Sequence, residues 1–305
     1  IIMDFKSKII LISGPTASGK SHFAIKLAKK INGEIINADS MQVYKQLRIL
    51  SARPNPKDYQ KIKHHLYGFH DVKKNFSTGD WLKLTIKKIK EIKNRKKTPI
   101  LVGGTGLYFK SLTDGLVKIP NVPIRVRNKI RKLHKDLGQK KFYQKLIKLD
   151  SSYKKNINPT DAQRSIRAYE VKLFTNKTLH DWFKNTKSVF KDDDFYKIYI
   201  DYPRLDLIKR IANRTDTMLK SGAIAEVKRF IKLKVKKDKS VNKAIGIHEI
   251  AEHLSDGKDL SLIKEKISIK TRQYAKRQST WARGNMKSWL KLAPQDLNNF
   301  LKKIK

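Results

Sequence analysis

The first third of the chain alternates short apolar runs with stretches whose apolar residues recur every three or four positions. Residues 9–12, 34–38 and 99–102 are mostly apolar runs of strand length. Residues 24–31 and 81–89 carry apolar side chains at the spacing of one helix face. Because strands that are buried on both sides belong to parallel sheets covered by helices, this pattern predicts an α/β fold with a parallel sheet flanked by helices.

The pattern changes in the middle of the chain. Strand signals are absent from residues 116–195, where basic amphipathic stretches at 124–137 and 140–149 indicate helices. Residues 197–201 favour a strand that returns to the sheet, and residues 204–305 are again mainly helical. The predicted organisation is therefore a first core segment at 1–115, a helical insertion at 116–195, and a second core segment with C-terminal basic helices at 196–305.

A glycine-rich segment joins the first predicted strand to the first predicted helix. Gly14-Pro15-Thr16-Ala17-Ser18-Gly19-Lys20-Ser21 matches the phosphate-binding pattern of Gly, four residues, Gly, Lys and Ser or Thr. Backbone N–H groups in such a turn and the positive end of the helix dipole favour an anion. Lys20 can reach phosphate oxygens, and the Ser21 hydroxyl can coordinate Mg²⁺. A surface loop rich in glycine and serine is the alternative.

Asp39 follows the second predicted strand and is expected to face the same crevice as the phosphate loop, because ligands bind at the carboxyl ends of parallel strands. The strand at 99–102 ends in glycines at 103–106 and lacks the carboxylate with which an NTP-hydrolysing enzyme normally holds Mg²⁺. Asp39 is therefore the candidate base or metal partner. Its alternative role is that of a helix N-cap.

Composition narrows the class of partner. The formal net charge is +43, from 70 Lys and Arg against 27 Asp and Glu in 305 residues, which predicts a polyanionic partner and salt-dependent binding. The absence of cysteine excludes disulfides, zinc–thiolate sites and a cysteine nucleophile. The run at 9–12 is too short to span a membrane and no signal peptide precedes it. We therefore expect a cytoplasmic protein without membrane association.

The predicted insertion has a polar cluster of its own. Asp161 is a helix-start signal, and Gln163, Arg164 and Arg167 follow it on the same predicted helix. Glutamine beside two arginines suits base edges and phosphates, although all three are also ordinary residues of an exposed helix. The predicted apolar face of this helix consists of Ala162, Ile166, Tyr169 and Leu173.

Residues 271–283 interleave cations with aromatic side chains. Tyr274, Gln278 and Trp281 share one face of a helix, where aromatic rings can stack on bases while neighbouring cations hold phosphates. The alternative, which we favour for Trp281, is that the aromatic residues anchor the core.

Taken together, six motifs resemble one known family over nearly the whole chain. The sequence is similar to the bacterial tRNA dimethylallyltransferases, which prenylate the adenosine just 3′ of the anticodon. The motifs are the phosphate loop, Asp39-Ser40-Met41-Gln42-Val43-Tyr44, Val102-Gly103-Gly104-Thr105-Gly106-Leu107-Tyr108, Asp161-Ala162-Gln163-Arg164, Ala244-Ile245-Gly246, and residues 271–281.

The resemblance implies a P-loop core with an inserted helical domain, dimethylallyl diphosphate as donor, Mg²⁺, and the tRNA anticodon stem-loop as partner of a monomer. It implies catalytic roles for Asp39 and Thr105. The diphosphate-binding residues are then Gly14, Thr16, Ala17, Ser18, Gly19, Lys20, Ser21, Arg210 and Arg214, with Ser21 also at the metal. The tRNA-binding residues are Asp39, Ser40, Met41, Gln42, Thr105, Arg127, Gln163, Arg164, Ser165, Ile166, Arg167, Lys243 and His248.

The chemistry of such a transfer assigns roles to these residues. The exocyclic amine of adenine is a poor nucleophile and must lose a proton, for which Asp39 is the candidate base. A flipped-out adenine would approach the glycines at 103–104. Arg210 and Arg214 lie four apart on a predicted helix and can clamp the diphosphate, or else form a solvated basic face.

The sequence departs from the family pattern at three places. Gly68 stands where the family usually has an acidic residue, Ile247 and His248 replace an aromatic and a base, and Asn176 replaces a turn glycine. The pair His64-His65 lacks further ligands and does not favour a metal site. Two other functions share parts of the pattern: a small-molecule P-loop kinase does not need the charge, and a nucleic-acid-dependent ATPase needs the missing strand-end carboxylate.

Overall fold

The structure is a computed structural model that describes residue 5, residues 7–184 and residues 186–304. Its contacts divide the chain into two compact units, one of residues 1–113 and 190–305 and the other of residues 114–189. The second unit ends before the limit of 195 expected for the insertion. Phe190 packs against Phe195 in the core of the first unit, with ring centroids 5.8 Å apart, so the segment before the returning strand belongs to that core.

A six-stranded parallel sheet forms the centre of the first unit, which confirms the predicted fold class. The four strands expected from apolar runs are present, and two very short strands that no apolar run predicted extend the edges of the sheet. In spatial order the strands are β3 (His64–His65), β2 (Gly33–Asn37), β4 (Thr98–Gly103), β1 (Ile9–Ser13), β5 (Phe195–Ile200) and β6 (Leu290–Leu292).

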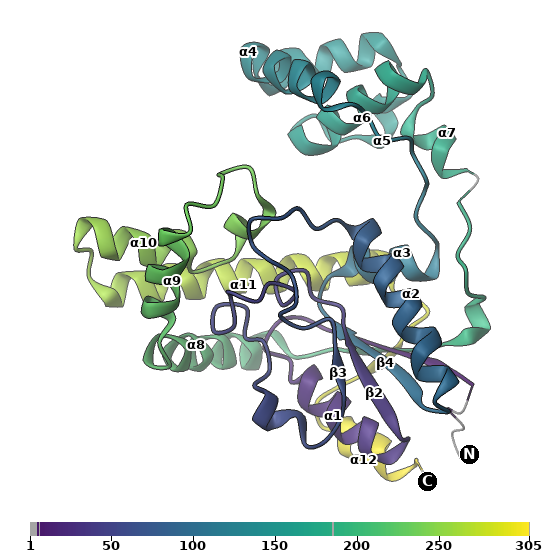
Figure 1. The fold of residues 1–305 in the computed structure, drawn as a ribbon, viewed down its shortest axis with the longest axis vertical. Helices are drawn as coiled ribbons and strands as arrows, with labels where there is room; N and C mark the ends of the chain where they lie inside the picture. The colour runs from purple at the N-terminus through teal and green to yellow at the C-terminus, as the bar shows by residue number, and fades with distance from the viewer. Residues whose placement is uncertain (1–4, 6, 185, 305) are drawn as a thin grey trace. The chain divides into compact units, whose positions relative to one another are not determined.

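Helices cover both faces of this sheet (Figure 1). Ile10 and Ile12 of β1 point to a cluster that includes helix α1 (Lys20–Lys30) and helix α12 (Asp296–Lys302). Ile9 and Leu11 point to the opposite cluster. Because both faces are buried, the strand is continuously apolar rather than alternating. The opposite cluster contains residues of α2 (Thr78–Asn94), α3 (Gly106–Thr113) and the end of α11 (Leu260–Asn285).

A third apolar cluster lies among the C-terminal helices and the loop that follows β2. The Glu226 carboxylate is buried there and accepts backbone N–H groups of Arg48, Ile49 and Leu50 at 2.9–3.1 Å. These bonds tie the loop to the helices. The helices that contribute to this cluster are α8 (Arg204–Lys220), α9 (Ala223–Lys232), α10 (Ile247–Asp256), α11 and the 3₁₀ helix η3 (Ser240–Lys243). Two further 3₁₀ helices, η1 (Pro56–Tyr59) and η2 (Asp192–Asp194), contribute no residue to it.

The second unit is helical, as predicted for this part of the chain. The two amphipathic stretches form one helix, α4 (Ile124–Leu149), that breaks at Gly138, where φ is 69° and ψ is 165°. The short helix α5 (Tyr153–Asn156) follows, and then α6 (Ala162–Thr175) and α7 (Leu179–Phe183). None of the helices in the described part of the chain combines the length and the apolar content that crossing a bilayer requires.

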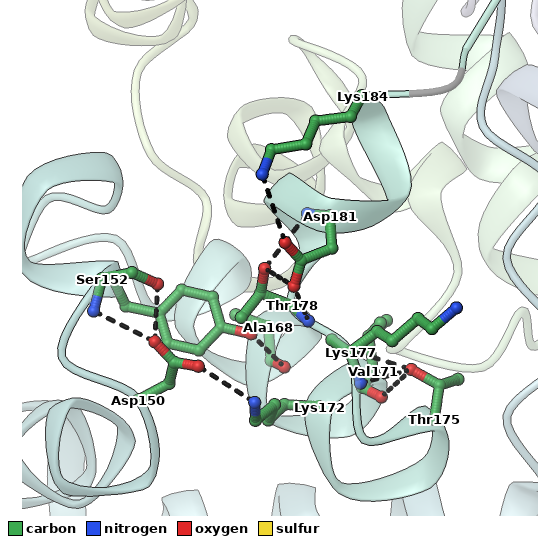
Figure 2. A network of polar contacts seen from close by, with 11 residues as sticks. Asp150, Ser152, Ala168, Val171, Lys172, Thr175, Lys177, Thr178, Asp181 and Lys184 are labelled. Atoms are coloured by element: carbon green, nitrogen blue, oxygen red, sulfur yellow. Dashed lines mark hydrogen bonds and ion pairs between the residues drawn. The ribbon is translucent and has the colours of Figure 1, made fainter.

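Polar contacts fix the turns of this unit (Figure 2). Asp150 accepts hydrogen bonds from Ser152 and from Lys172 at 3.0 Å. Thr178 and Asp181 form a capping box at the start of α7. Asn176 ends α6 in the left-handed conformation, with φ of 56°, which asparagine tolerates where glycine is usual.

The predicted apolar face of α6 is only partly confirmed. Tyr169 packs beside the apolar cluster of this unit, with its ring centroid 5.2 Å from that of Phe142. Leu173 is exposed, and the buried residues of the helix are Ser165, Ala168, Glu170 and Val171. The buried side of the helix thus includes Ser165, Ala168 and Glu170, small or charged residues that a pattern of apolar positions does not single out.

Candidate active site

The phosphate loop connects the end of β1 to the start of α1, as the motif predicts. Ala17 and Gly19 both have positive φ, 65° and 83°. Alanine in this conformation costs about 1 kcal/mol, so surrounding contacts must hold the loop in place. Lys20 is the first residue of α1, and its Nζ donates to the Pro15 carbonyl at 3.2 Å across the loop.

Side chains from the C-terminal half of the chain hold this loop. Arg210 Nε donates to the Ala17 carbonyl at 2.7 Å, and Arg214 Nη1 donates to Thr16 Oγ1 at 2.7 Å. The Thr16 N–H donates to Gln278 Oε1 at 2.8 Å. Arg210 and Arg214 therefore lie against the phosphate loop rather than on a purely solvated face. Sequence reasoning noted Gln278 only as a neighbour of two aromatic residues and missed this contact, because the partner lies far away in the sequence.

The charges around the loop are coupled. Burial lowers the pKa of Lys20 to about 8, with the nearby Arg214 acting in the same direction and Asp39 opposing both. Burial also lowers the pKa of Arg214, again opposed by Asp39. Two cations and one carboxylate thus share a site in which solvent screens them poorly, and an added anion would be attracted there.

Asp39 lies in the turn after β2, and the side chain of Asn37 fixes its backbone. The Asp39 N–H donates to Asn37 Oδ1 at 2.9 Å, and Asn37 Nδ2 donates to the Asp39 carbonyl at 3.0 Å. Asp39 Oδ1 accepts the Met41 N–H at 2.9 Å. The residues after Asp39 form turns rather than a helix, so Asp39 closes a turn and the helix N-cap alternative is wrong.

Thr105 holds the ends of β2 and β4 together. Its Oγ1 accepts the Ser40 N–H at 3.0 Å, and its own N–H donates to the Ala38 carbonyl at 3.2 Å. A Cβ atom at Gly103 would lie 2.0 Å from the Ala38 carbonyl oxygen, so only glycine permits this approach. The two strand ends, with Asp39 on one and Thr105 beyond the other, therefore form one rigid edge.

The loop and this edge open into a cavity of about 770 Å³. Tyr274 lines it with Arg277 and Thr271, and burial raises the pKa of the Tyr274 hydroxyl. Trp281 instead packs in the core against Gly106, as favoured from the sequence. Of the residues proposed from the sequence, the lining includes Thr16, Ala17, Gly19, Lys20, Ser21, Asp39, Ser40, Met41, Gln42, Arg210, Arg214 and Lys243.

Oxygen ligands for a cation are available at this cavity, where Ser21 and Asp39 both line the wall. Among the residues that the structure describes, no group of three or more His, Asp or Glu side chains lies close enough together to hold a metal ion. The two adjacent histidines have other partners: His64 stacks on Tyr59 with ring centroids 3.7 Å apart, and His65 Nε2 bonds to Glu34 at 2.7 Å.

Comparisons with known proteins show the family of the chain. Residues 42–285 match a protein-family model described as IPP transferase. The chain belongs to this family. It is 62% identical to a tRNA dimethylallyltransferase of Pelagibacter ubique, over 99% of this chain and 97% of the relative. A tRNA dimethylallyltransferase of Rickettsia massiliae is 42% identical, over 98% of this chain and 83% of the relative.

Solved structures of the IPP transferase family share the fold. A tRNA isopentenylpyrophosphate transferase from Staphylococcus epidermidis matches with a TM-score of 0.69 and 33% identity, covering 98% of this chain and 97% of that one. A eukaryotic dimethylallyltransferase acting on tRNA matches with a TM-score of 0.82 and 27% identity, covering 98% and 80% respectively.

In this family member, the residues predicted on α6 differ in exposure. Gln163 and Arg164 are exposed, and Ile166 is half-buried. Ser165 is fully buried, where its Oγ donates to the Asp161 carbonyl at 2.8 Å. Arg167 pairs with the buried Glu170 at 3.4 Å.

The remaining predicted positions of the family member lie on other elements. Arg127, on α4, is half-buried, and its Nε is buried without a hydrogen-bond partner. His248 is exposed on α10 and is not part of the cavity lining, while Ile247 beside it packs in the third apolar cluster. Gly68 has φ of 55°, and the Arg53 guanidinium occupies the space that its side chain would fill.

Proposed function

We propose that the protein transfers a dimethylallyl group from dimethylallyl diphosphate to the exocyclic amine of the adenosine 3′ of the anticodon in tRNA, releasing diphosphate. One observation carries the proposal: a single cavity contains both the phosphate loop with Lys20 and the carboxylate of Asp39. A diphosphate site and a proton acceptor within one cavity are what this substitution requires. The names of the family relatives support the same substrates.

The donor end of the site stabilises the leaving group. The diphosphate lies in the loop of residues 14–21, with Lys20 as its cationic partner and Arg210 and Arg214 holding the loop around it. As the allylic C–O bond breaks, the electron pair leaves with the diphosphate, and these cations offset the growing charge. The oxygen atoms of Ser21 and Asp39, which both line the cavity, would hold Mg²⁺, a hard cation that prefers oxygen and would supply further positive charge to the leaving group.

The acceptor end activates the amine. The nitrogen lone pair forms the new C–N bond, and the proton that the nitrogen loses passes to the Asp39 carboxylate. The Met41 N–H donates to that carboxylate, and the Asn37 side chain fixes the backbone that carries it. Thr105, bonded to Ser40, holds the edge against which the flipped adenine would lie.

The excess of positive charge contributes to RNA binding. With a net charge of +43, long-range attraction and phosphate contacts supply the non-specific part of the affinity. We assign the anticodon stem-loop contacts to Arg127, Gln163, Arg164, Ile166 and Arg167 in the second unit, and to Ser40–Gln42, Lys243 and His248 in the first unit. Ser165 is fully buried and supports α6 from inside the unit instead. Because tRNA is the acceptor, we place the reaction in the cytoplasm. We further propose that the enzyme acts as a monomer.

The deciding experiment follows a label. The protein is incubated with either labelled dimethylallyl diphosphate or γ-labelled ATP, each with and without tRNA and with and without Mg²⁺. We expect label from the prenyl donor to appear in tRNA only with Mg²⁺ present, and no tRNA-stimulated release of phosphate from ATP, because β4 ends in glycines rather than a carboxylate. Robust tRNA-dependent ATP turnover would instead establish an ATPase, and transfer of the γ-phosphate to a small molecule would establish a kinase.

A further inference from the structure

The side-chain amide of Gln278 joins the two halves of the active site. Gln278 lies on α11, far in sequence from both of its partners. Its Oε1 accepts the N–H of Thr16 in the phosphate loop at 2.8 Å, and its Nε2 donates to the Gly104 carbonyl at 2.9 Å. One bond therefore reaches the donor side of the site, and the other reaches the turn after β4 on the acceptor side.

The fit of this amide is close. A Cβ atom at Gly104 would lie 2.1 Å from Gln278 Nε2, closer than any carbon side chain tolerates. The next contact outside Gln278 is the Gly14 carbonyl at 3.4 Å, an ordinary distance. Glycine at position 104 thus leaves room for the glutamine amide in particular.

Both partners of the amide belong to elements that position reacting groups. Thr16 is also held through its hydroxyl by Arg214 at 2.7 Å, so the start of the phosphate loop has two side-chain contacts. Gly104 precedes Thr105, which bonds to Ser40, the neighbour of Asp39. The amide therefore ties Thr16 of the phosphate loop to the turn that leads to Thr105, beyond the point where β1 and β4 pair at Ser13 and Gly103.

The chemistry of the two bonds also restricts the residue. One end must accept an N–H and the other must donate to a carbonyl, which glutamine does with a single planar group. Glutamate offers two acceptors and would face the Gly104 carbonyl with a negative charge. Alanine offers neither bond.

We propose that Gln278 is a positioning residue that sets the spacing between the diphosphate loop and the turn carrying Thr105, and so aligns the allylic carbon with the attacking amine. This role rests on the proposed transferase function. It acts through Thr16 and Gly104 rather than through contact with a substrate. Misalignment of reacting atoms slows the chemical step more than it weakens binding, so the turnover number should change more than substrate affinity.

The first test compares Gln278→Ala and Gln278→Glu with Gln273→Ala and Gln273→Glu, which change an exposed glutamine on the same helix. We expect kcat to fall about tenfold or more for both Gln278 variants, with tRNA Kd within about twofold of wild type. The KM for dimethylallyl diphosphate should rise in the glutamate variant alone, because its charge opposes the diphosphate. The Gln273 variants should match wild type. Unchanged kcat at position 278, or equal losses at 273, would overturn the proposal.

The second test uses the close fit at Gly104 and does not depend on the stability of one variant. Gly104→Ala is measured in the wild-type and the Gln278→Ala backgrounds. In the wild-type background the new methyl group displaces the amide, and we expect a loss of kcat similar to that of Gln278→Ala. In the Gln278→Ala background the methyl group has space, so no further loss should follow. Equal losses in both backgrounds would show that Gly104 acts independently of Gln278.

The wild-type protein in the same assay separates the two proposals. If wild type transfers label to tRNA and the Gln278 variants do so at the wild-type rate, the transferase function stands and the positioning role is refuted. If wild type transfers no label, the function fails, and the positioning role fails with it.

Discussion

The affinity for the prenyl donor should depend on pH above about 7.5 because of Lys20. Burial lowers the pKa of this lysine to about 8 in the site without donor. A diphosphate binds the charged ammonium, so the lysine must carry its proton in the complex. With a pKa of about 8, roughly three quarters of the molecules carry that proton at pH 7.5 but only about one in eleven at pH 9. If only the charged form binds, Kd rises about eightfold over this interval, or about 1 kcal/mol.

Isothermal titration with dimethylallyl diphosphate at fixed Mg²⁺, without tRNA, measures this change. The donor stays fully ionised in this window, because the second ionisation of a phosphate lies near pH 6. Lys20→Arg keeps its charge throughout and should give a flat curve, whatever its absolute affinity. Lys26→Arg, an exposed change on α1, should retain the wild-type curve. A wild-type Kd that stays constant from pH 7.5 to 9, or a rise that persists in Lys20→Arg, would refute this reasoning.

Four further substitutions test other parts of the structure. Asp39→Asn keeps the Oδ1 that accepts the Met41 N–H but cannot take up a proton, so the single-turnover rate should fall roughly 10²-fold while the Kd for tRNA stays unchanged. A wild-type rate would show that Asp39 has only a structural role in its turn. Arg167→Ala should reduce the slope of log affinity against log salt concentration by less than about one, because Glu170 already neutralises part of the arginine charge. Gln163→Ala should lower selectivity for the cognate stem-loop without changing that slope. Binding at the wild-type level by both variants would show that α6 does not contact the RNA. Burial raises the pKa of the Glu34 carboxyl, but hydrogen bonds from Arg95 and His65 outweigh burial and lower this pKa to about 2. The carboxylate therefore stabilises the fold fully above about pH 4.5 and loses that effect between about pH 4.5 and 2. Glu34→Gln should lower the free energy of unfolding, measured by urea titration at pH 7, by about 3 kcal/mol, and an equal loss at pH 3 would contradict this link between ionisation and stability.

The sequence predicted the parts of the site that short spacing defines. The phosphate loop, the strand before it and the helix after it lie within a few turns of chain, so local pattern was enough to place Lys20 and Ser21. The placement of Asp39 needed one additional rule, that ligands bind at the carboxyl ends of parallel strands. The proximity of Arg210 and Arg214 to the loop was expected from the chemistry of a diphosphate, and the structure places both against it.

Other features of the fold and the site could not be predicted from local sequence patterns, each for a physical reason. The strands β3 and β6 have two and three residues, too few for any period to show. The buried side of α6 includes Ser165 and Ala168, small residues that a pattern of large apolar positions does not single out. The contact of Gln278 with Thr16 joins residues far apart in the chain, and the only available signal was the space that a glycine at 104 leaves open.

The position of β1 in the sheet has a consequence for how the protein is made. β1 lies between β4 and β5, yet β5 begins only at Phe195, after the whole of the second unit. On a ribosome that adds 5–20 residues per second, one edge of β1 stays unpaired for roughly 10–40 seconds after it emerges. During that time the nascent chain exposes an apolar strand edge of the kind that pairs with other chains. Synthesis of the inserted helices thus delays the pairing of β1 with β5. We expect the nascent chain to depend on chaperones until residue 200 has been made.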